Sequence, residues 1–534
     1  MSLAPLPVYW IDASTKYLVA LTAGNILLFN NEDGALISAL DARVDASVHV
    51  DPNSPEVAWA AAPRLCAISK NEEFIAVASD DKMLHVWRPD ALEYGREVLL
   101  QPLSKRASTM QWTICDLRSM PGQEVVVSDK FGDVWSFPID NSEPCKKYGP
   151  NPPHDPEQLG IRPRLGHVSM ITSMAFLGNP EIVPASIITG DRDEHIRISR
   201  WGATRASNVV QQYLMGSKSF IGALAIVPRI AAQSVSLSVR RAILSSDGGT
   251  TIRIWTDELY EFSLRNVANI DPALIRPYVK LDADVERRRE KAAGDCAFKG
   301  VFFAEPSGEE PPLVITRLVV VQSSNQFWVM VTWEGATAFA FIPLLAIAMA
   351  KESDMLKRED VHIYDVGSPI LNTAIVSGSH TTVWIACDDR EGFGQGPPLR
   401  KYGIEDGKYV PDSRSDPSPL AELTGKPSAI DPTLTAPAAT NAKLTALPHV
   451  PRALAPPETL SQLCLYSALV THPKPTSIGL LDNEGAPFAK PLLASSTDAK
   501  SKSMIVRQQS GKRAAGRAKN QATILEQYNS QPSR

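Results

Sequence analysis

The residues most able to do chemistry lie together in a short charged segment, residues 190–201. Four consecutive charged residues, Asp191 to Glu194, lead directly into an alternating strand that Trp201 closes. A turn between two strands usually needs only one Asp or Asn and one Gly to satisfy its backbone. The surplus charge of this turn therefore predicts a surface that meets another molecule.

The strand that follows this turn carries one basic candidate, Arg197. His85 and Arg253 take the matching position in two other strands, so a polar residue there is by itself a feature of the repeated pattern. Beside the charged turn, we expect an exposed guanidinium, held by flanking acids, to offer a pre-oriented fork to a carboxylate of a partner protein. The candidate partner-binding residues are Asp191, Arg192, Asp193, Glu194, His195 and Arg197.

The chain lacks the residue patterns of the common enzyme classes. It has no HExxH, no P-loop, no GxSxG and no spaced metal cluster among its 9 histidines. Gly392, Gly394 and Gly396 resemble a nucleotide-binding loop, but Pro397 and Pro398 follow, so no helix N-terminus is positioned to receive a phosphate. We expect a flexible turn there, and no catalytic residue, cofactor or metal site in the chain.

The charge composition limits how the chain can meet a nucleic acid. Its 54 Lys and Arg residues stand against 59 Asp and Glu residues, a formal net charge of −5. This balance excludes a uniformly basic surface and leaves room for local basic patches. Solvated surface charge is the default interpretation of each basic residue, but residues that share one rim would form a phosphate-facing patch. The candidates for such a patch are Lys105, Arg106, Arg162 and Arg164.

The cysteines and the apolar runs bear on the cellular compartment. The 6 cysteines are scattered without CxxC spacing, which predicts reduced thiols of an intracellular protein. The first residues carry no basic region followed by an apolar segment, so we do not expect secretion. The longest apolar run, residues 338–350, contains Pro343 and is too short to span a bilayer. We expect a soluble chain without a membrane partner.

The first 400 residues repeat one local pattern: a short apolar strand, a turn rich in Asp, Gly or Ser, and a second strand that ends in an aromatic residue. Turn aspartates accept backbone donors, glycines supply positive φ, and the aromatic side chain fills the space between neighbouring sheets. This is the pattern of WD-type propeller blades. Six such units and a weaker seventh lie at 18–29, 74–87, 124–137, 186–201, 242–255, 327–341 and 383–389.

The predicted fold is therefore all-β: a seven-bladed WD40-type β-propeller with long loop insertions and a largely disordered C-terminal tail. Successive aromatic closures of the first five units are 48 to 66 residues apart, more than the roughly 40–45 residues of a compact WD blade. We expect the ring to close with the strand near Val8 to Asp12 beside the C-terminal strands. The extra residues are expected in loops at 51–63, 149–163, 281–298 and 305–312.

A Gly-His pair, Gly166-His167, precedes the fourth unit and supports the same fold. In WD blades this histidine bonds to a turn Asp and to a Ser or Thr, so we favour a structural role for His167 over a catalytic one. Ser217 takes the matching place before the fifth unit. We therefore expect that internal network to be absent there.

Composition divides the chain into a propeller at 1–404, a Pro/Ala/Thr/Ser-rich linker at 405–457, a docking segment at 458–490 and a basic disordered tail at 491–534. No acidic residue lies between 499 and 525. The basic run is most simply a solvated tail, and its second interpretation is nuclear import or loose nucleic-acid contact. On the second interpretation we expect a nuclear protein.

Three segments together resemble one family: residues 165–170 (Leu-Gly-His-Val-Ser-Met), 190–199 and 129–137. The family is the WD-repeat, non-catalytic subunit of the tRNA (guanine-N7)-methyltransferase. The resemblance is close over about residues 60–260 and extends weakly to about 400. A generic WD protein would share the tryptophans of these segments without their charges.

The resemblance implies a seven-bladed propeller that binds and stabilises a separate Rossmann-type catalytic subunit as a heterodimer. That partner would hold S-adenosylmethionine and methylate a guanine in the variable loop of tRNA. The basic residue matching Arg197 pairs with an acidic residue of the catalytic subunit in this family, beside the 191–194 turn. Contact with tRNA through the complex would then involve the basic candidates named above. Expanded loops, Ser217 and the long tail depart from the family pattern.

Two other functions are compatible with a propeller. A general WD-repeat scaffold, such as the substrate receptor of a ubiquitin ligase, would use the top face of the disc and depend little on residues 190–197. An independent enzyme would require the isolated chain to bind S-adenosylmethionine. Copurification separates the first two functions, because only the heterodimer predicts a stoichiometric Rossmann-type methyltransferase.

Overall fold

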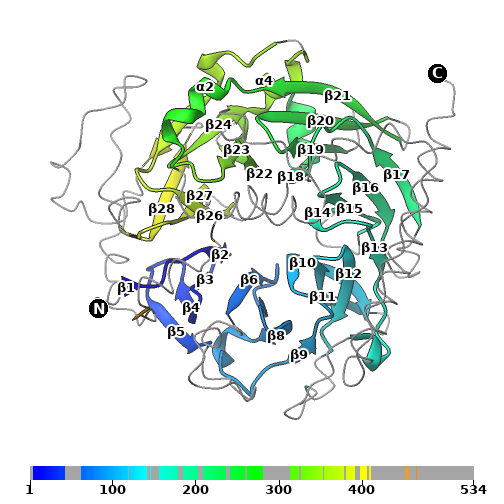
Figure 1. The fold of residues 1–534 in the computed structure, drawn as a ribbon, viewed down its shortest axis with the longest axis vertical. Helices are drawn as coiled ribbons and strands as arrows, with labels where there is room; N and C mark the ends of the chain where they lie inside the picture. The colour runs from blue at the N-terminus through cyan, green and yellow to red at the C-terminus, as the bar shows by residue number, and fades with distance from the viewer. Residues whose placement is uncertain are drawn as a thin grey trace, which may run out of the picture.

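The computed structural model of the chain forms seven four-stranded antiparallel sheets arranged as blades around a ring (Figure 1). The predicted seven-bladed β-propeller is therefore confirmed. The structure describes residues 4–42, 62–117, 120–140, 145, 156–178, 184–202, 209–235, 241–258, 261–280, 313–323, 326–352, 354–377, 381–390, 397–405, 408–410, 452, 454–455 and 465.

Each of the first four blades is built from four consecutive strands. Blade 1 consists of β2 (Trp10–Ala13), β3 (Tyr17–Leu21), β4 (Asn25–Asn30) and β5 (Leu36–Asp41). Blade 2 consists of β6 (Pro63–Ile68), β7 (Ile75–Ser79), β8 (Met83–Trp87) and β9 (Leu99–Pro102). Blade 3 consists of β10 (Ala107–Leu117), β11 (Met120–Asp129), β12 (Asp133–Pro138) and β13 (Leu165–Gly166). Blade 4 consists of β14 (Ile171–Leu177), β15 (Ser186–Asp191), β16 (Ile196–Arg200) and β17 (Val210–Leu214).

The remaining blades follow the same order. Blade 5 consists of β18 (Ile221–Val227), β19 (Ala242–Asp247), β20 (Thr251–Glu258) and β21 (Glu261–Asn269). Blade 6 consists of β22 (Ile315–Ser323), β23 (Gln326–Trp333), β24 (Ala338–Pro343) and β25 (His362–Asp365). Blade 7 consists of β26 (Ile370–Val376), β27 (Thr381–Cys387), β28 (Leu399–Glu405) and β29 (Lys408–Val410). The paired strands expected from sequence are the two middle strands of these sheets.

The turn between the two middle strands of a blade lies beside the segment that enters the inner strand. The second turn residue donates its backbone N–H to this segment in blades 2, 3 and 4: Asp80 to the Ala62 oxygen, Lys130 to the Arg106 oxygen and Arg192 to the Met170 oxygen. Because antiparallel strands reverse direction at every turn, these middle turns and entering segments share one face of the ring. We call it the middle-turn face.

Aromatic side chains fill the spaces between blades, as the repeat predicts. Trp87, Trp135 and Trp255 are buried among apolar residues of the preceding blade. Trp201 of blade 4 packs on the valines of blade 3 and donates its indole N–H to the Glu124 Oε1 at 3.0 Å. A buried indole needs such an acceptor for its polar tip. These contacts bind each blade to its neighbour and make the ring rigid.

The ring closes by side-chain packing between blade 7 and blade 1. The strand expected to close it, β2, lies beside β26, but it belongs to its own four-stranded sheet. Trp384 of blade 7 lies in the apolar cluster of blade 1 and donates to the Asn31 Oδ1 at 2.7 Å. Beyond the expected boundary at 404, β29 completes blade 7. A two-stranded sheet pairs β1 (Ala4–Pro5) with β30 (Leu454–Ala455), inside the expected linker.

Short helices lie between strands of the ring. They are α1 (Arg229–Ser234), α2 (Pro272–Ile275), α4 (Leu344–Met349), η1 (Pro89–Ala91), η2 (Pro156–Leu159), η3 (Arg276–Tyr278) and η4 (Arg358–Asp360). Among the described residues, no helix has the length and apolar character needed to cross a membrane. The described cysteines, Cys66, Cys115, Cys145 and Cys387, are free thiols. Most residues of the expected insertions, the Gly392–Gly396 run and almost all of the C-terminal tail lie outside the described residues.

Candidate functional site

The charged turn of blade 4 is held by the carboxylate of Asp191. Its Oδ1 accepts the backbone N–H groups of Asp193 at 2.8 Å and His195 at 3.0 Å, and its own N–H donates to the His195 oxygen at 3.0 Å. Glu194 takes a left-handed conformation with a φ of 71°. Gly132 takes the same place in the turn of blade 3 with a φ of 88°. Lys82 takes the same place in the turn of blade 2 with a φ of 69°, so a left-handed residue is a feature of this repeated turn.

A buried network of hydrogen-bonded side chains holds this turn in place. The Nδ1 of His167 lies 2.8 Å from the Asp191 Oδ2, and its Nε2 lies 2.7 Å from the Thr189 Oγ1. All three side chains are buried. The structural role predicted for His167 is therefore confirmed. The carboxylate of Asp191 is occupied by the turn and by His167, so this candidate supports the surface without being part of it.

His167 and Asp191 are the two titratable members of this network, and the fold lowers the pKa of both. Burial and the nearby Arg197 charge lower the pKa of the His167 imidazole to about 4, although Asp191 opposes both effects. Burial alone would raise the pKa of the Asp191 carboxyl, but hydrogen bonds from His167 and His195 outweigh it and hold the pKa well below its usual range. Near neutral pH, a neutral imidazole therefore donates to an ionised carboxylate.

The expectation that Arg197 is exposed is wrong. Its side chain is only 7% exposed, and its Nη1 donates to the Gly166 backbone oxygen at 3.0 Å. The reason is its strand: β16 lies between β15 and β17 in the sheet, and neighbouring blades cover both faces. His85 and Arg253, at the matching positions, are buried as well. Arg197 thus ties the middle strand to the segment that contains His167.

The accessible part of the charged turn is therefore smaller than the sequence predicted. Arg192, Asp193, Glu194 and His195 are partly exposed, and they place one base, two acids and a histidine on a short stretch of backbone. The imidazole of His195 packs edge-on against Tyr213 at a centroid distance of 6.0 Å. We call residues 192–195 the charged corner. It is a preorganised polar surface on the middle-turn face.

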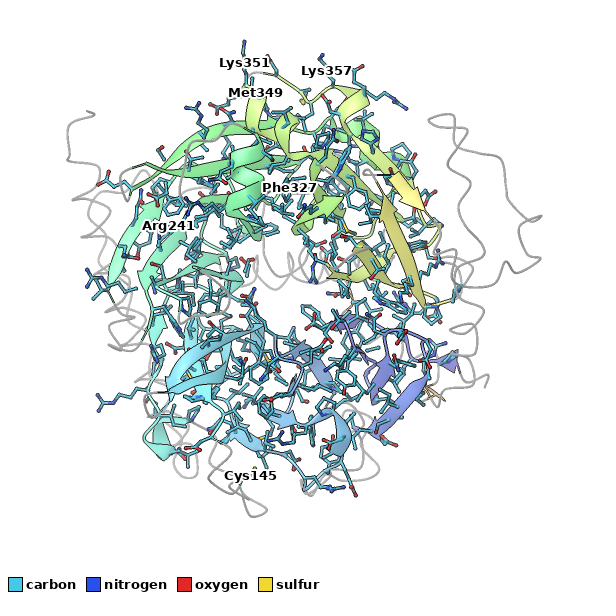
Figure 2. The ribbon with its side chains drawn as sticks, turned by 180° about the vertical axis from the view of Figure 1, so that it is seen from behind. Cys145, Arg241, Phe327, Met349, Lys351 and Lys357 are labelled. Carbon is cyan, nitrogen blue, oxygen red and sulfur yellow. The ribbon has the colours of Figure 1, made fainter. Side chains whose placement is uncertain are left out.

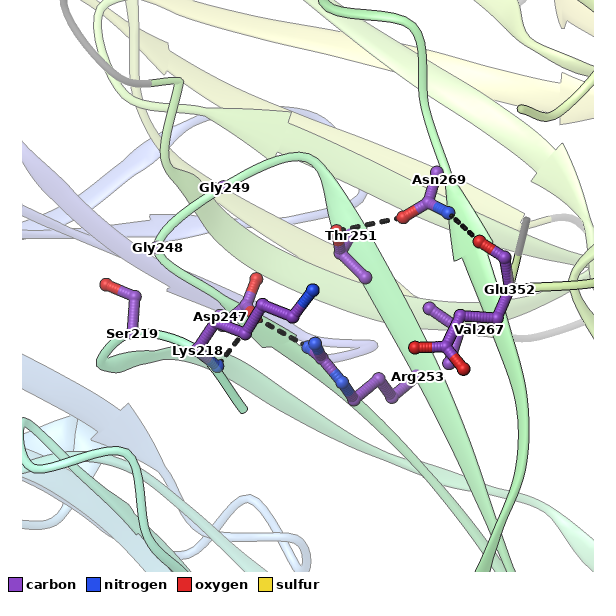
Figure 3. Close-up of a pocket in the computed structure, with 10 residues that line it drawn as sticks. All are labelled: Lys218, Ser219, Asp247, Gly248, Gly249, Thr251, Arg253, Val267, Asn269 and Glu352. Atoms are coloured by element: carbon purple, nitrogen blue, oxygen red, sulfur yellow. Dashed lines mark hydrogen bonds and ion pairs between the residues drawn. The ribbon is translucent and has the colours of Figure 1, made fainter. Parts of the chain in front are cut away.

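The next blade contains a polar pocket of about 270 Å³ on the same face (Figure 3). In place of the histidine network, Arg253 donates to the Asp247 Oδ2 at 2.6 Å, and the Lys218 backbone N–H donates to the same oxygen at 3.2 Å. The expected network is thus absent from blade 5 in its histidine form, as Ser217 predicts. A buried ion pair replaces it. Two bases, Lys218 and Arg253, and two acids, Asp247 and Glu352, line the pocket, so the formal charges of its walls balance.

The basic candidates separate into two groups. Lys105 and Arg106 lie in the segment that enters blade 3, on the middle-turn face. The Arg164 guanidinium lies 4.5 Å from the Trp201 ring centroid and donates to the Gly202 oxygen at 3.3 Å, between blades 3 and 4. Arg162 is exposed in the connection that precedes β13. Arg164 is thus committed to packing between two blades.

Sequence reasoning missed the residues that accompany Lys105 and Arg106. The charges of Arg64, Lys82, Lys105 and Arg106 each act on the Lys130 ammonium group and help to lower its pKa, although burial is the largest cause. Arg64 lies in β6, and the other residues come from the segment that enters blade 3 and from the middle turns of blades 2 and 3. Their repeated position before or after an apolar strand was the available signal, because equivalent turns of neighbouring blades share one face.

The fold and these sites define a WD-repeat β-propeller whose middle-turn face carries a charged corner and a basic region. The family model described as the tRNA methyltransferase TRM82 WD40 domain matches residues 37–160 and 146–401. The chain belongs to this family.

Relatives with curated names share this description. The chain is 28% identical over 207 residues to "tRNA (guanine-N(7)-)-methyltransferase non-catalytic subunit wdr4" of Xenopus laevis, covering 38% of the chain and 42% of that protein. It is 32% identical over 167 residues to "tRNA (guanine-N(7)-)-methyltransferase non-catalytic subunit TRM82" of Meyerozyma guilliermondii, covering 30% and 33%. The chain thus spans less than half the length of these relatives. A chain of the mitotic checkpoint complex is similar with a TM-score of 0.43 and 12% identity, covering 72% of this chain and 90% of that one.

Proposed function

We propose that this chain is a non-catalytic subunit that binds a catalytic tRNA (guanine-N7)-methyltransferase subunit and stabilises its active form. The complex would form N7-methylguanosine in the variable loop of tRNA. The single observation that carries the proposal is the family match over residues 37–401, together with relatives named as non-catalytic subunits of that enzyme. Nuclear localisation belongs to the same proposal and depends on the basic C-terminal run.

The charged corner is the proposed contact with the catalytic subunit. Its side chains project from a turn that Asp191 and His167 hold in one conformation. A preorganised surface loses little conformational entropy on binding, so it can fix a partner in one geometry. Correct positioning of reacting groups is a large part of catalysis. The chain would therefore raise activity without contributing a catalytic residue.

Asp191 and Arg197 are positioning residues in this proposal. Both are buried, and both support the backbone from which the charged corner projects. Replacing Arg197 by Glu would remove its hydrogen bond to the Gly166 oxygen and bury an acid in the interior, so that variant would test folding as much as assembly. Partly exposed residues of the charged corner provide the sharper test.

Reconstitution tests the proposed function. The catalytic subunit should methylate tRNA poorly alone and well after addition of this chain, and the chain alone should transfer no methyl group. The two proteins should coelute at one-to-one stoichiometry. Methylation by the isolated chain, or full activity of the catalytic subunit without it, would contradict the proposal. Copurification with ubiquitin-ligase subunits in place of a methyltransferase would favour the general scaffold.

Variants of the charged corner test the contact itself. We expect Arg192→Glu with Asp193→Lys to weaken assembly about tenfold or more, because it reverses the local charge pattern. Glu194→Gly removes the charge at a position where glycine fits the backbone, so it should weaken assembly while the fold is retained. The control is Lys357→Glu, since Lys357 lies at the outer edge of the ring, across from blades 1–3 (Figure 2). Unchanged affinity in both corner variants would remove the corner from the interface.

A further inference from the structure

Five basic residues gather on the middle-turn face of blades 2 and 3. We call them the cationic patch: Arg64, Lys82, Lys105, Arg106 and Lys130. Backbone hydrogen bonds hold their segments together, from Leu103 N to the Lys82 oxygen at 2.7 Å and from Lys130 N to the Arg106 oxygen at 3.2 Å. The patch is therefore built on rigid turns and not on a single mobile loop.

One carboxylate, Asp80, forms ion pairs with two members of this patch. Asp80 lies 2.8 Å from the Arg64 Nη1 and 3.8 Å from the Arg106 Nη1. Other acids of these turns support the backbone: the Asp81 Oδ1 accepts the Met83 N–H, and the Asp129 Oδ1 accepts the Phe131 N–H, both turn contacts of under 3 Å. Positive charges held this close repel one another, so an added anion such as a phosphate would relieve the repulsion.

An aromatic ring lies exposed in the middle of this patch. Phe131, at the tip of the blade 3 turn, is 46% exposed. The Lys105 and Lys130 ammonium groups lie 4.8 Å and 5.7 Å from its ring centroid. Asp193 holds the same position in the turn of blade 4. A large apolar side chain that is exposed contributes little to folding. The Phe131 ring instead faces solvent and the ammonium groups of two lysines.

The turn that carries Phe131 cannot relax easily. Gly132 has a φ of 88°, and a Cβ there would lie 2.3 Å from the Ser169 backbone oxygen and 2.9 Å from the His167 backbone oxygen. The indole N–H of Trp135 also donates to the Asp129 Oδ2 at 3.2 Å. The ring is therefore presented at a fixed place beside the entering segment of blade 4, whose own turn carries the charged corner.

We propose that the cationic patch binds an unpaired segment of RNA, with one base stacked on Phe131 and the adjoining phosphates on the surrounding lysines and arginines. Exposed aromatic rings beside basic side chains are the combination that recognises single-stranded nucleic acid. The two ammonium groups lie at the ring in the free protein, and their flexible stems let them move to phosphates when a base takes their place. The inference rests on the proposed function, because the shared face places such RNA beside a subunit docked at the charged corner.

The test uses the intact complex with its catalytic subunit and measures tRNA affinity at several salt concentrations. Phe131→Ala should weaken tRNA binding at least about fivefold, the lower end of measured base stacking, without changing the salt dependence. Phe131→Trp should restore the affinity. Lys105→Gln and Lys130→Gln should each reduce the slope of log affinity against log salt by about 0.7 for each lost phosphate contact. The control variant is Lys357→Gln.

Four further readouts separate this inference from the proposed function. Coelution and methylation at saturating tRNA report assembly, so normal assembly with unchanged tRNA affinity in Phe131→Ala overturns the inference alone. Binding of a uridine-rich RNA oligonucleotide to the chain without its partner, and photocrosslinking of 4-thiouridine to the 129–133 peptide, test the patch even if no complex forms. Weaker assembly of the patch variants with unchanged RNA affinity would show a protein contact and overturn the inference.

Discussion

At the scale of single residues, the surroundings of His167 determine its function. Its two ring nitrogens lie within hydrogen-bond distance of Asp191 and Thr189, and its side chain is buried. No acceptor or donor capacity of the imidazole faces solvent, so it cannot serve as a general base. Its function is to hold the turn from which the charged corner projects, and this role makes the stability of the turn depend on pH.

We expect the chain to lose stability in mild acid through His167. The pKa of its imidazole is about 4 in the fold against 6.5 in the unfolded chain. The unfolded chain therefore binds a proton between pH 6.5 and 4 that the folded chain does not, so stability is full above pH 6.5 and declines by about 3 kcal/mol toward pH 4. Urea unfolding followed by tryptophan fluorescence across this range measures the decline.

His167→Ala provides the comparison. This variant should be less stable than the wild type at pH 7, because Asp191 and Thr189 lose their buried partner. The difference in the free energy of unfolding should shrink as the pH falls from 6.5 to 4.5, since the variant has no imidazole to protonate. Parallel pH profiles for the two proteins would contradict the assignment.

At the scale of the strands, the approach of blade 4 to blade 5 depends on one small residue. A Cβ at Gly190 would lie 2.5 Å from the Ile221 Cγ2 and 2.8 Å from its Cβ. Thr172 donates its hydroxyl to the Gly190 oxygen at 3.2 Å and bonds to the Ile221 oxygen as well. The backbone of Gly190 in blade 4 therefore packs against the side chain of Ile221 in blade 5, next to the charged corner.

Gly190→Ala should destabilise the propeller by about 1–3 kcal/mol, because the added methyl group overpacks the fully buried, branched side chain of Ile221. The matched control is Gly249→Ala, where the nearest atom to a Cβ is the Asp247 Oδ1 at 3.6 Å. Thermal unfolding measures both. Combining Gly190→Ala with Ile221→Ala should cost less than the sum of the two single changes. Strict additivity would mean that the two residues do not interact.

At the scale of the whole molecule, the two ends of the ring are joined by a contact distant in sequence. The Arg452 Nη1 lies 2.8 Å from the Asp389 Oδ2 and 3.2 Å from the Leu6 backbone oxygen. Burial raises the pKa of the Asp389 carboxyl, and the charge of Arg452 opposes this rise. Together with the β1–β30 pairing, this ion pair links blade 7 to the residues before blade 1.

We expect Arg452→Ala to destabilise the ring by about 1–3 kcal/mol, because it leaves a largely buried carboxylate without its partner. Arg452→Met with Asp389→Asn should recover part of this loss, since neither residue then carries a buried charge. Differential scanning calorimetry measures both variants. Equal unfolding temperatures for Arg452→Ala and the wild type would show that the contact does not stabilise the ring.

The propeller, its middle strands and the structural role of His167 follow from the sequence alone. These features depend on local pattern: apolar alternation, turn residues and an aromatic closure recur in each blade, and neighbours of adjacent strands are close in the chain. The family resemblance of residues 129–199 depends on the same short segments. Local information sufficed because each blade is one continuous stretch of chain.

The accessible surface could be known only after the blades were packed together. The sequence predicts that Arg197 is an exposed base, but the packed blades bury it. Lys105 and Phe131 lie in two separate segments of the sequence, and only the folded blade brings the Lys105 ammonium group to 4.8 Å from the Phe131 ring centroid. Burial and charge clustering depend on contacts between residues distant in sequence, and such contacts leave no periodic trace in the chain.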